Sequence, residues 1–170
     1  FSIPLGMLCA MGKLTKIPPL RWILGVYTWV FRGTPLLLQL LFVYFGLPYL
    51  GLELSREMAA YVTFVINYAA YFTEIFRAGI QSIDRGQYEA AKALGMNFRM
   101  TMRRIIIPQA IKVILPPTGN EAVTLVKDTA LASVIALAEI LRNAKSMVSR
   151  NASIEGYIIA AILYLMMTFV

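Results

Sequence analysis

Long uncharged stretches alternate with short polar segments along the chain, and this alternation predicts its architecture. The run from Gly33 to Leu52 contains no ionisable residue, and it has about the 20 residues that a bilayer-spanning helix requires. Comparable apolar runs recur, and the predicted spans are residues 1–11, 34–50, 58–80, 105–126 and 156–170. We therefore predict an all-α integral membrane protein with about five transmembrane helices.

Shorter segments of distinct character lie between the predicted spans. Residues 20–31 are amphipathic and are expected to lie in the membrane interface. The fourth span is expected to be interrupted by residues that disrupt helices, namely Pro108, Pro116, Pro117 and Gly119. Residues 129–138 are apolar but too short to cross a bilayer, so they are either re-entrant or a continuation of the fourth span. Residues 139–155 are predicted to form a polar loop.

Both ends of the sequence fall inside apolar runs, Phe1–Gly12 and Gly156–Val170. We therefore expect both ends to cut through spanning helices, so that the predicted bundle is truncated. No basic region precedes Phe1, so no signal peptide is recognisable. The prediction is one transmembrane domain over residues 1–170, with a cytoplasmic loop at about 81–104.

Composition narrows the function classes. Hydrophobic residues make up 59% of the 170 residues and charged residues 15%, whereas soluble domains average about 25% charged residues. The single cysteine, Cys9, excludes an intramolecular disulfide and a cysteine metal cluster. The sequence has no histidine, which removes the commonest catalytic base and metal ligand. We predict no catalytic residues and no metal site, so a membrane enzyme is disfavoured.

The net charge of +7 fits either nucleic-acid binding or the excess of Lys and Arg on cytoplasmic loops. One side of the predicted topology receives Lys13, Lys16, Arg21, Arg32, Arg77, Arg85, Lys92, Arg99, Arg103 and Arg104. The other side receives only Arg56, Arg142, Lys145 and Arg150. This asymmetry places residues 81–104 in the cytoplasm and argues against nucleic acid as a partner.

The cytoplasmic loop is predicted to contain a short helix. Asp84 is its expected N-cap, and Gln87 is the expected capping-box partner. Alanines follow, and Gly95 is a natural C-terminal stop. Small side chains allow a partner to approach closely, which suits docking of the helix into a groove. The alternative is an ordinary solvated loop helix.

The loop sequence resembles a known signature. Glu89-Ala90-Ala91, three residues, Gly95, nine residues and then Ile105-Ile106-Ile107-Pro108 is similar to the "EAA" signature of ATP-binding-cassette (ABC) importer permeases, with Ile107 where Leu is usual. The resemblance implies a type I ABC importer permease-like fold. It also implies that the loop helix docks into a cleft on a separate ATPase subunit. The residues to which that role carries over are Tyr88, Glu89, Ala90, Ala91, Leu94 and Gly95.

Four further segments resemble the subfamily for polar amino acids (histidine, glutamate, glutamine, arginine and opine types). They are residues 32–40, 74–80, 119–121 and 127–129. The resemblance implies a multi-pass permease subunit of an ATP-driven importer of polar or charged amino acids, in the bacterial cytoplasmic (inner) membrane. A stand-alone secondary transporter or channel for a small polar solute is the alternative. It gives no reason for the signature between Glu89 and Pro108.

The resemblance also implies partners. They are ABC ATPase subunits, a second permease chain (identical or homologous), an extracytoplasmic solute-binding protein, the lipid bilayer and the amino acid substrate. The chain has no Gly-x-x-x-x-Gly-Lys-Ser/Thr motif for ATP phosphates, so we expect no cofactor in this chain and place ATP and Mg on the partner ATPase.

Polar residues in the apolar spans are candidates for the substrate pathway, because a charge at membrane depth needs a partner or a water-filled cavity. The candidates are Asn67, Glu74, Asn120, Glu121 and Asp128. Glu121 follows the proline pair and is expected to bind an ammonium group of the substrate. The alternatives are that Glu121 pairs with Lys127 or another subunit, and that Glu74 forms a structural pair with Arg77.

Overall fold

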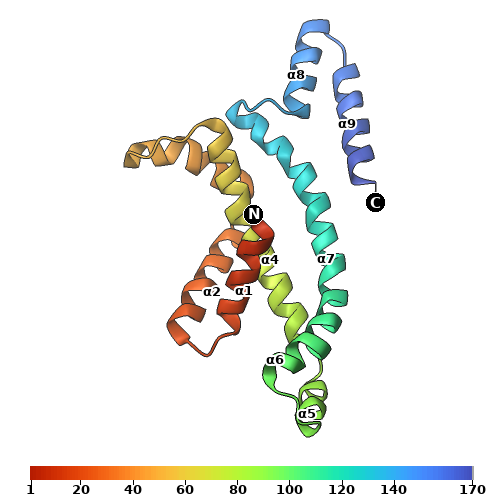
Figure 1. Cartoon of the computed structure of the whole chain (residues 1–170). Helices are drawn as coiled ribbons and strands as arrows, with labels where there is room; N and C mark the ends of the chain where they lie inside the picture. Colours follow the sequence, from red (N-terminus) through yellow and green to blue (C-terminus); the bar gives the residue numbers. More distant parts are fainter. Residues whose placement is uncertain (170) are drawn as a thin grey trace. The chain divides into compact units, whose positions relative to one another are not determined.

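The computed structural model describes residues 1–169, and these residues form helices joined by short turns, without any strand (Figure 1). The chain divides into two compact units. Unit 1 combines Phe1–Gly33 with Tyr68–Asn120, and unit 2 combines Thr34–Asn67 with the residues from Glu121 onward. Helices α4 (Arg56–Gln81) and α7 (Ile107–Asp128) each contribute to both units.

Unit 1 contains the N-terminal hairpin and the segment predicted to be cytoplasmic. Besides parts of α4 and α7, its elements are α1 (Ser2–Leu14), α2 (Pro18–Gly33), α5 (Arg85–Ala93), α6 (Phe98–Thr101) and the π-helical turn η3 (Met102–Ile106). Helix α1 packs against α2 and lies close to α4. A Cβ atom at Gly6 would lie 2.6 Å from the Cβ of Phe72, so this approach of α1 to α4 requires glycine.

Unit 2 is built around a small apolar core. Its elements besides parts of α4 and α7 are α3 (Leu36–Leu41), η1 (Phe42–Gly46), η2 (Leu47–Leu50), η4 (Thr129–Ile135), α8 (Ile140–Asn151) and α9 (Glu155–Thr168). Leu40, Ala60 and Ile135 are buried together in its core. Helices α8 and α9 pack against each other, with Ala144 and Ala160 buried.

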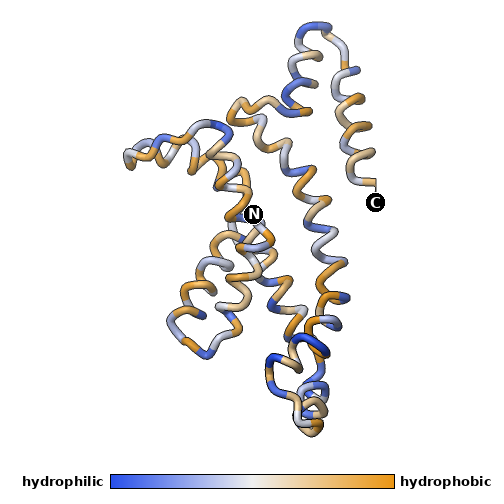
Figure 2. Tube along the Cα trace, viewed as in Figure 1, coloured by the Kyte–Doolittle hydropathy of each residue, from blue (hydrophilic) through white to orange (hydrophobic). Residues whose placement is uncertain are grey.

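The predicted spans correspond to observed helices. The five predicted apolar runs match α1, the stretch α3–η1–η2, α4, α7 and α9 in that order. Taken one at a time, the described helices do not reach the length and hydropathy of a complete membrane span. Helix α2 and the stretch Leu36–Leu50 reach it only as a pair, across the break between them. Figure 2 shows apolar residues along α9, whose side chains are mostly exposed.

Two local predictions are wrong and one open choice is decided. Helix α7 runs without a break through Pro116 and Pro117. These prolines remove two backbone N–H donors, but helical residues on both sides hold the same backbone conformation.

Residues 139–155 contain α8 rather than a loop, because Glu139 caps a helix there with bonds from the backbone N–H groups of Leu141 and Arg142. Residues 129–135 continue α7 as a 3₁₀ helix.

Candidate functional site

The predicted loop helix is present as α5, and its first turn is held by Asp84. The Asp84 carboxylate accepts a hydrogen bond from the backbone N–H of Gly86 at 2.6 Å, as an N-cap does. The predicted capping-box role of Gln87 is wrong. Its side-chain oxygen instead accepts a hydrogen bond from Gln109 of α7 at 3.2 Å. This contact links the start of α5 to α7 within unit 1.

Gly95 ends α5, as predicted from the sequence. Its φ angle of +73° lies in the left-handed region that favours glycine. The N–H of Gly95 donates to the carbonyl of Lys92 at 3.0 Å, and the N–H of Met96 donates to the carbonyl of Ala91 at 3.0 Å. This pair of bonds is a Schellman motif, which satisfies the last carbonyls of the helix.

The docking residues predicted on α5 divide into exposed and buried ones. Glu89, Ala90 and Gly95 are exposed, and 78% of Leu94 is exposed. Ala91 is fully buried in the chain's own packing, where α5 contacts α6 and η3. Tyr88 is half-buried. The surface available to a partner is therefore Glu89, Ala90, Leu94 and Gly95, whereas Ala91 fixes α5 to its own loop.

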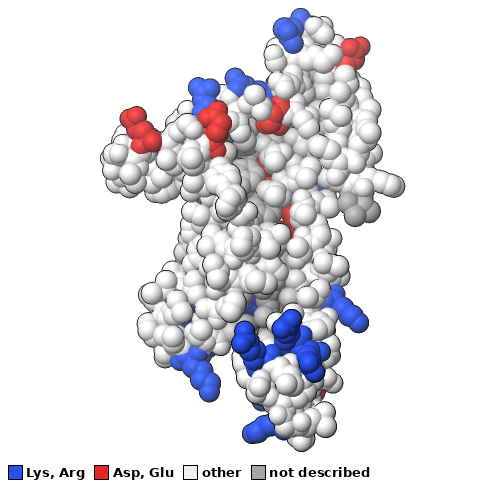
Figure 3. Space-filling view, viewed as in Figure 1, with Lys and Arg blue, Asp and Glu red and all other residues white. Residues whose placement is uncertain are grey.

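One apolar residue and a cationic cluster extend this surface. Phe98, the first residue of α6, is 76% exposed and was not predicted as a docking residue. Arg99, Arg103 and Arg104 are also exposed. Figure 3 shows the blue side chains gathered over the end of unit 1 that carries α5 and α6. The combination presents apolar side chains beside positive charge, which suits a protein partner with a complementary cleft.

Glu74 has two cationic partners rather than one. Its carboxylate pairs with Arg77, as the structural alternative predicted, at 2.7 Å from Nη2 and 2.8 Å from Nε. It also pairs with Lys13 of α1, and Lys13 Nζ donates to Thr28 Oγ1 of α2 at 2.8 Å. One polar cluster therefore joins α1, α2 and α4. Because the charge of Glu74 is already compensated, the cluster favours a structural role for this residue.

Asn67 also makes structural contacts. It is buried, and its side-chain Nδ2 donates to Gln39 Oε1 of α3 at 2.9 Å. Gln39 Nε2 in turn donates to Thr34 Oγ1 at 2.8 Å and to the Thr34 carbonyl at 3.1 Å. This chain of hydrogen bonds connects the start of the second predicted span to the third within unit 2.

The remaining pathway candidates lie on α7 and at its end. Asn120 is exposed, and Glu121 and Asp128 are half-buried. Glu121 and Asp128 are seven residues apart, so their side chains leave the helix on the same side. Pro116 and Pro117 have no N–H, so the carbonyls of the residues four positions earlier lose their helical donors. The two carboxylates of Glu121 and Asp128 are the groups on this side of α7 that can bind ammonium groups.

Sequence reasoning missed three residues that matter in these contacts: Lys13, Gln39 and Phe98. A carboxylate at membrane depth with only one partner three residues away signals a second cation, and Lys13 ends the neighbouring apolar run. Phe98 carried no comparable signal, because single apolar residues are common on protein surfaces. Gln39 carried no comparable signal, because its partner Asn67 is 28 residues away.

Comparisons with known proteins agree on one family. Residues 2–170 match the family described as "Binding-protein-dependent transport system inner membrane component". The chain is 44% identical to the arginine transport system permease protein ArtQ of Bacillus subtilis, over 98% of this chain and 78% of that protein. It is 39% identical to the L-cystine transport system permease protein TcyB of the same organism, over 99% of this chain and 73% of that protein. A solved structure titled "Crystal structure of an amino acid ABC transporter with histidines" matches with a TM-score of 0.92 at 44% identity, over 99% of this chain and 79% of that chain.

Proposed function

Because the chain belongs to the inner-membrane components of binding-protein-dependent transport systems, we propose that it is the permease subunit of an ATP-driven importer of polar or charged amino acids. The relatives named for arginine and L-cystine transport support this substrate class. In this proposal the chain crosses the bacterial cytoplasmic membrane several times, with α5 on the cytoplasmic side. The asymmetry of Lys and Arg between its loops supports that orientation.

The observation that carries the proposal is the exposed end of α5. Leu94, the C-cap residue of α5, and Phe98, the first residue of α6, are large apolar side chains exposed to solvent. Exposed apolar groups on a well-ordered surface mark contacts with a partner. The positive charges beside them indicate that this partner is acidic around its cleft. A separate ATPase subunit that binds ATP and Mg²⁺ is the partner we propose for this surface.

In this mechanism the chain performs no covalent chemistry. ATP binding closes two partner ATPases, the docked α5 helices move with them, and the spans switch from an inward-facing to an outward-facing arrangement. A second permease chain, identical or homologous, completes the pathway. An extracytoplasmic solute-binding protein delivers the amino acid.

The substrate-binding groups that we propose are Glu121, Asn120 and Asp128. An amino acid carries an α-ammonium group, and some side chains add a second cation. A carboxylate in an apolar helix interacts strongly with such a cation, since little water screens it. Asn120 is able to donate to the α-carboxylate or accept from the ammonium group. Asn67 and Glu74 are further candidates for the pathway, and both also make the contacts described above.

Replacing Leu94 by serine tests the docking role. The variant is expected to reduce co-purification of the ATPase and amino acid uptake, since an apolar contact is lost from the surface of α5. The matched control is Leu52→Ser, which changes another exposed leucine, in the turn before α4. Normal ATPase co-purification with Leu94→Ser would reject the docking surface. Uptake by the permease without any ATPase would favour a secondary transporter instead.

A further inference from the structure

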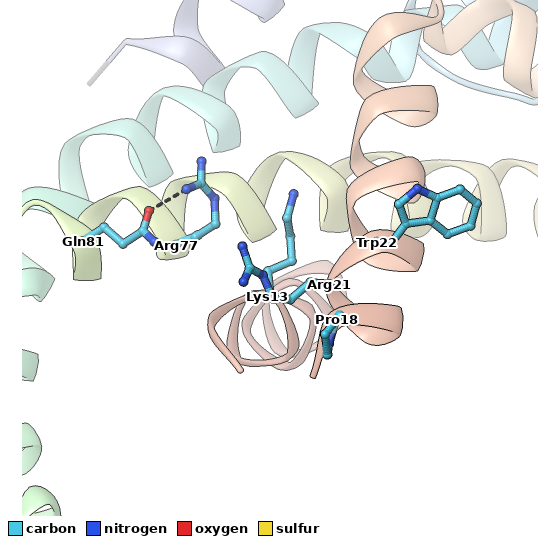
Figure 4. Close-up of a pocket in the computed structure, with 6 residues that line it drawn as sticks. All are labelled: Lys13, Pro18, Arg21, Trp22, Arg77 and Gln81. Carbon is cyan, nitrogen blue, oxygen red and sulfur yellow. Dashed lines mark hydrogen bonds between the residues drawn. The ribbon is translucent and has the colours of Figure 1, made fainter. Parts of the chain in front are cut away.

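A basic pocket lies in unit 1. Its walls come from the end of α1, the start of α2 and the end of α4, and it encloses about 410 Å³. The lining residues are Lys13, Pro18, Arg21, Trp22, Arg77 and Gln81 (Figure 4). None of them belongs to the docking surface or to the proposed substrate-binding groups.

The pocket carries more positive than negative charge. Three of its lining residues are cations, and the neighbouring carboxylate of Glu74 already pairs with both Lys13 and Arg77. Within residues 1–169, the guanidinium of Arg21 has no hydrogen-bond or ion-pair partner. The net positive charge and the free fork of Arg21 favour an anion with several oxygen atoms.

Gln81 adds a polar group with a fixed orientation. Its Oε1 accepts a hydrogen bond from Arg77 Nη1 at 2.5 Å, drawn as the dashed line in Figure 4. Because the oxygen of this amide is engaged by Arg77, its NH₂ group is the part left to donate. A ligand oxygen in the pocket therefore meets an amide donor in addition to the cations.

The rim of the pocket is apolar, which indicates an amphipathic ligand. Trp22 is 72% exposed, and its ring extends away from Gln81 in Figure 4. Ile23, the next residue of α2, and Ile17, in the connection before α2, are also exposed, at 58% and 53%; neither lines the pocket itself. Tryptophan, Lys and Arg gather where a membrane meets water, and the charge asymmetry assigns this end of α1 and α4 to the cytoplasmic face.

We propose that the basic pocket binds the phosphate of an anionic phospholipid headgroup from the cytoplasmic leaflet. Arg21 is the principal anion-binding residue. Lys13, Arg77 and Gln81 complete the polar wall, and Trp22 with the neighbouring isoleucines contacts the upper acyl chains. A free phosphate ion would use the same polar groups without the apolar rim.

The test uses the intact transporter, purified with its partner subunits and depleted of lipid. Native mass spectrometry measures retention of phosphatidylglycerol, with phosphatidylcholine and inorganic phosphate as comparison probes. The test variant is Arg21→Gln, which leaves the Glu74 pairs in place. The matched control is Lys16→Gln, because Lys16 is an exposed cation of the α1–α2 connection, close to Arg21 in the sequence, that does not line the pocket.

The wild-type complex is expected to retain phosphatidylglycerol in preference to phosphatidylcholine. Arg21→Gln should weaken this retention about five- to tenfold, whereas Lys16→Gln should not. Equal losses in both variants would overturn the proposal in favour of diffuse surface charge. Displacement of the lipid by inorganic phosphate at equal concentration would identify free phosphate as the ligand and overturn it too. Crosslinking of an Arg21→Cys variant to a partner subunit would identify a protein occupant instead.

Discussion

Replacing Gly95 tests whether the ATPase recognises the C-terminal end of α5 in the Schellman conformation described above. Gly95 has a φ angle of +73°, and an added Cβ would meet no atom of the chain within 4 Å. Alanine at this position therefore has space but an unfavourable backbone conformation. Asparagine also has space, and it tolerates the left-handed region better than other residues with a side chain.

The expected loss of ATPase binding follows from the cost of the left-handed backbone conformation at residue 95. An ordinary residue in the left-handed region costs about 1–2 kcal/mol, which is roughly a five- to thirtyfold change in an equilibrium. If the ATPase binds α5 only when its C-terminal end has the Schellman conformation, Gly95→Ala should weaken ATPase binding by about that factor. Gly95→Asn should weaken it less, although its side chain is larger.

The assay is a binding titration of purified ATPase against the permease in nanodiscs. Gly25→Ala is the matched control, because its Cβ also meets no atom within 4 Å and its φ is not positive. That change should leave ATPase binding unaltered. Wild-type affinity in Gly95→Ala would refute the reasoning. Equal losses in the alanine and asparagine variants would point to contact of the new Cβ with the partner rather than to backbone conformation.

Three other predictions follow from the cluster around Glu74, the topology and α7. Lys13→Met should lower the unfolding temperature of the permease more than Arg77→Gln does, because Lys13 is 15% exposed and Arg77 34%; equal shifts in thermal scans would contradict this. A cysteine at Arg99 in a Cys9→Ser background should react only with reagents added from the cytoplasmic side, and labelling from outside would overturn the topology. Glu121→Gln should raise the half-saturating substrate concentration for ATPase stimulation about ten- to a hundredfold without loss of assembly, and an unchanged value would remove Glu121 from the site.

Helix α5 was predictable from sequence because its signals are local. Asp84 and Gly95 each act on backbone groups within five residues, so residue type alone indicates where the helix begins and ends. Burial of Ala91 was not predictable in the same way. It depends on how α5 packs against α6 and η3, and that packing involves residues further along the chain.

The contacts inside the spans were less predictable because they join distant segments. Arg77 is three residues from Glu74 and was identified as a partner, whereas Lys13 is 61 residues away and was not. The predicted interruption of α7 at its prolines failed for a different reason. Pro116 and Pro117 lack backbone N–H donors and so remove hydrogen bonds from α7, but the helix does not end there. The prediction that these prolines interrupt the helix was therefore wrong, although each of them does remove a donor.

The helical segments from Phe98 to Ile135 follow one another without an intervening turn: α6, η3, α7 and η4. The Gln87–Gln109 bond joins the start of α5 to this continuous stretch. From Ile107 to Glu121 the rise along α7 is about 21 Å, at about 1.5 Å per residue. A helix resists compression along its axis, so in the proposed mechanism α7 is the element that would carry movement of α5 on a closing ATPase toward Glu121. The continuity of α7 through its proline pair, which the sequence did not predict, therefore supports the proposed coupling between the docking surface and the substrate-binding groups.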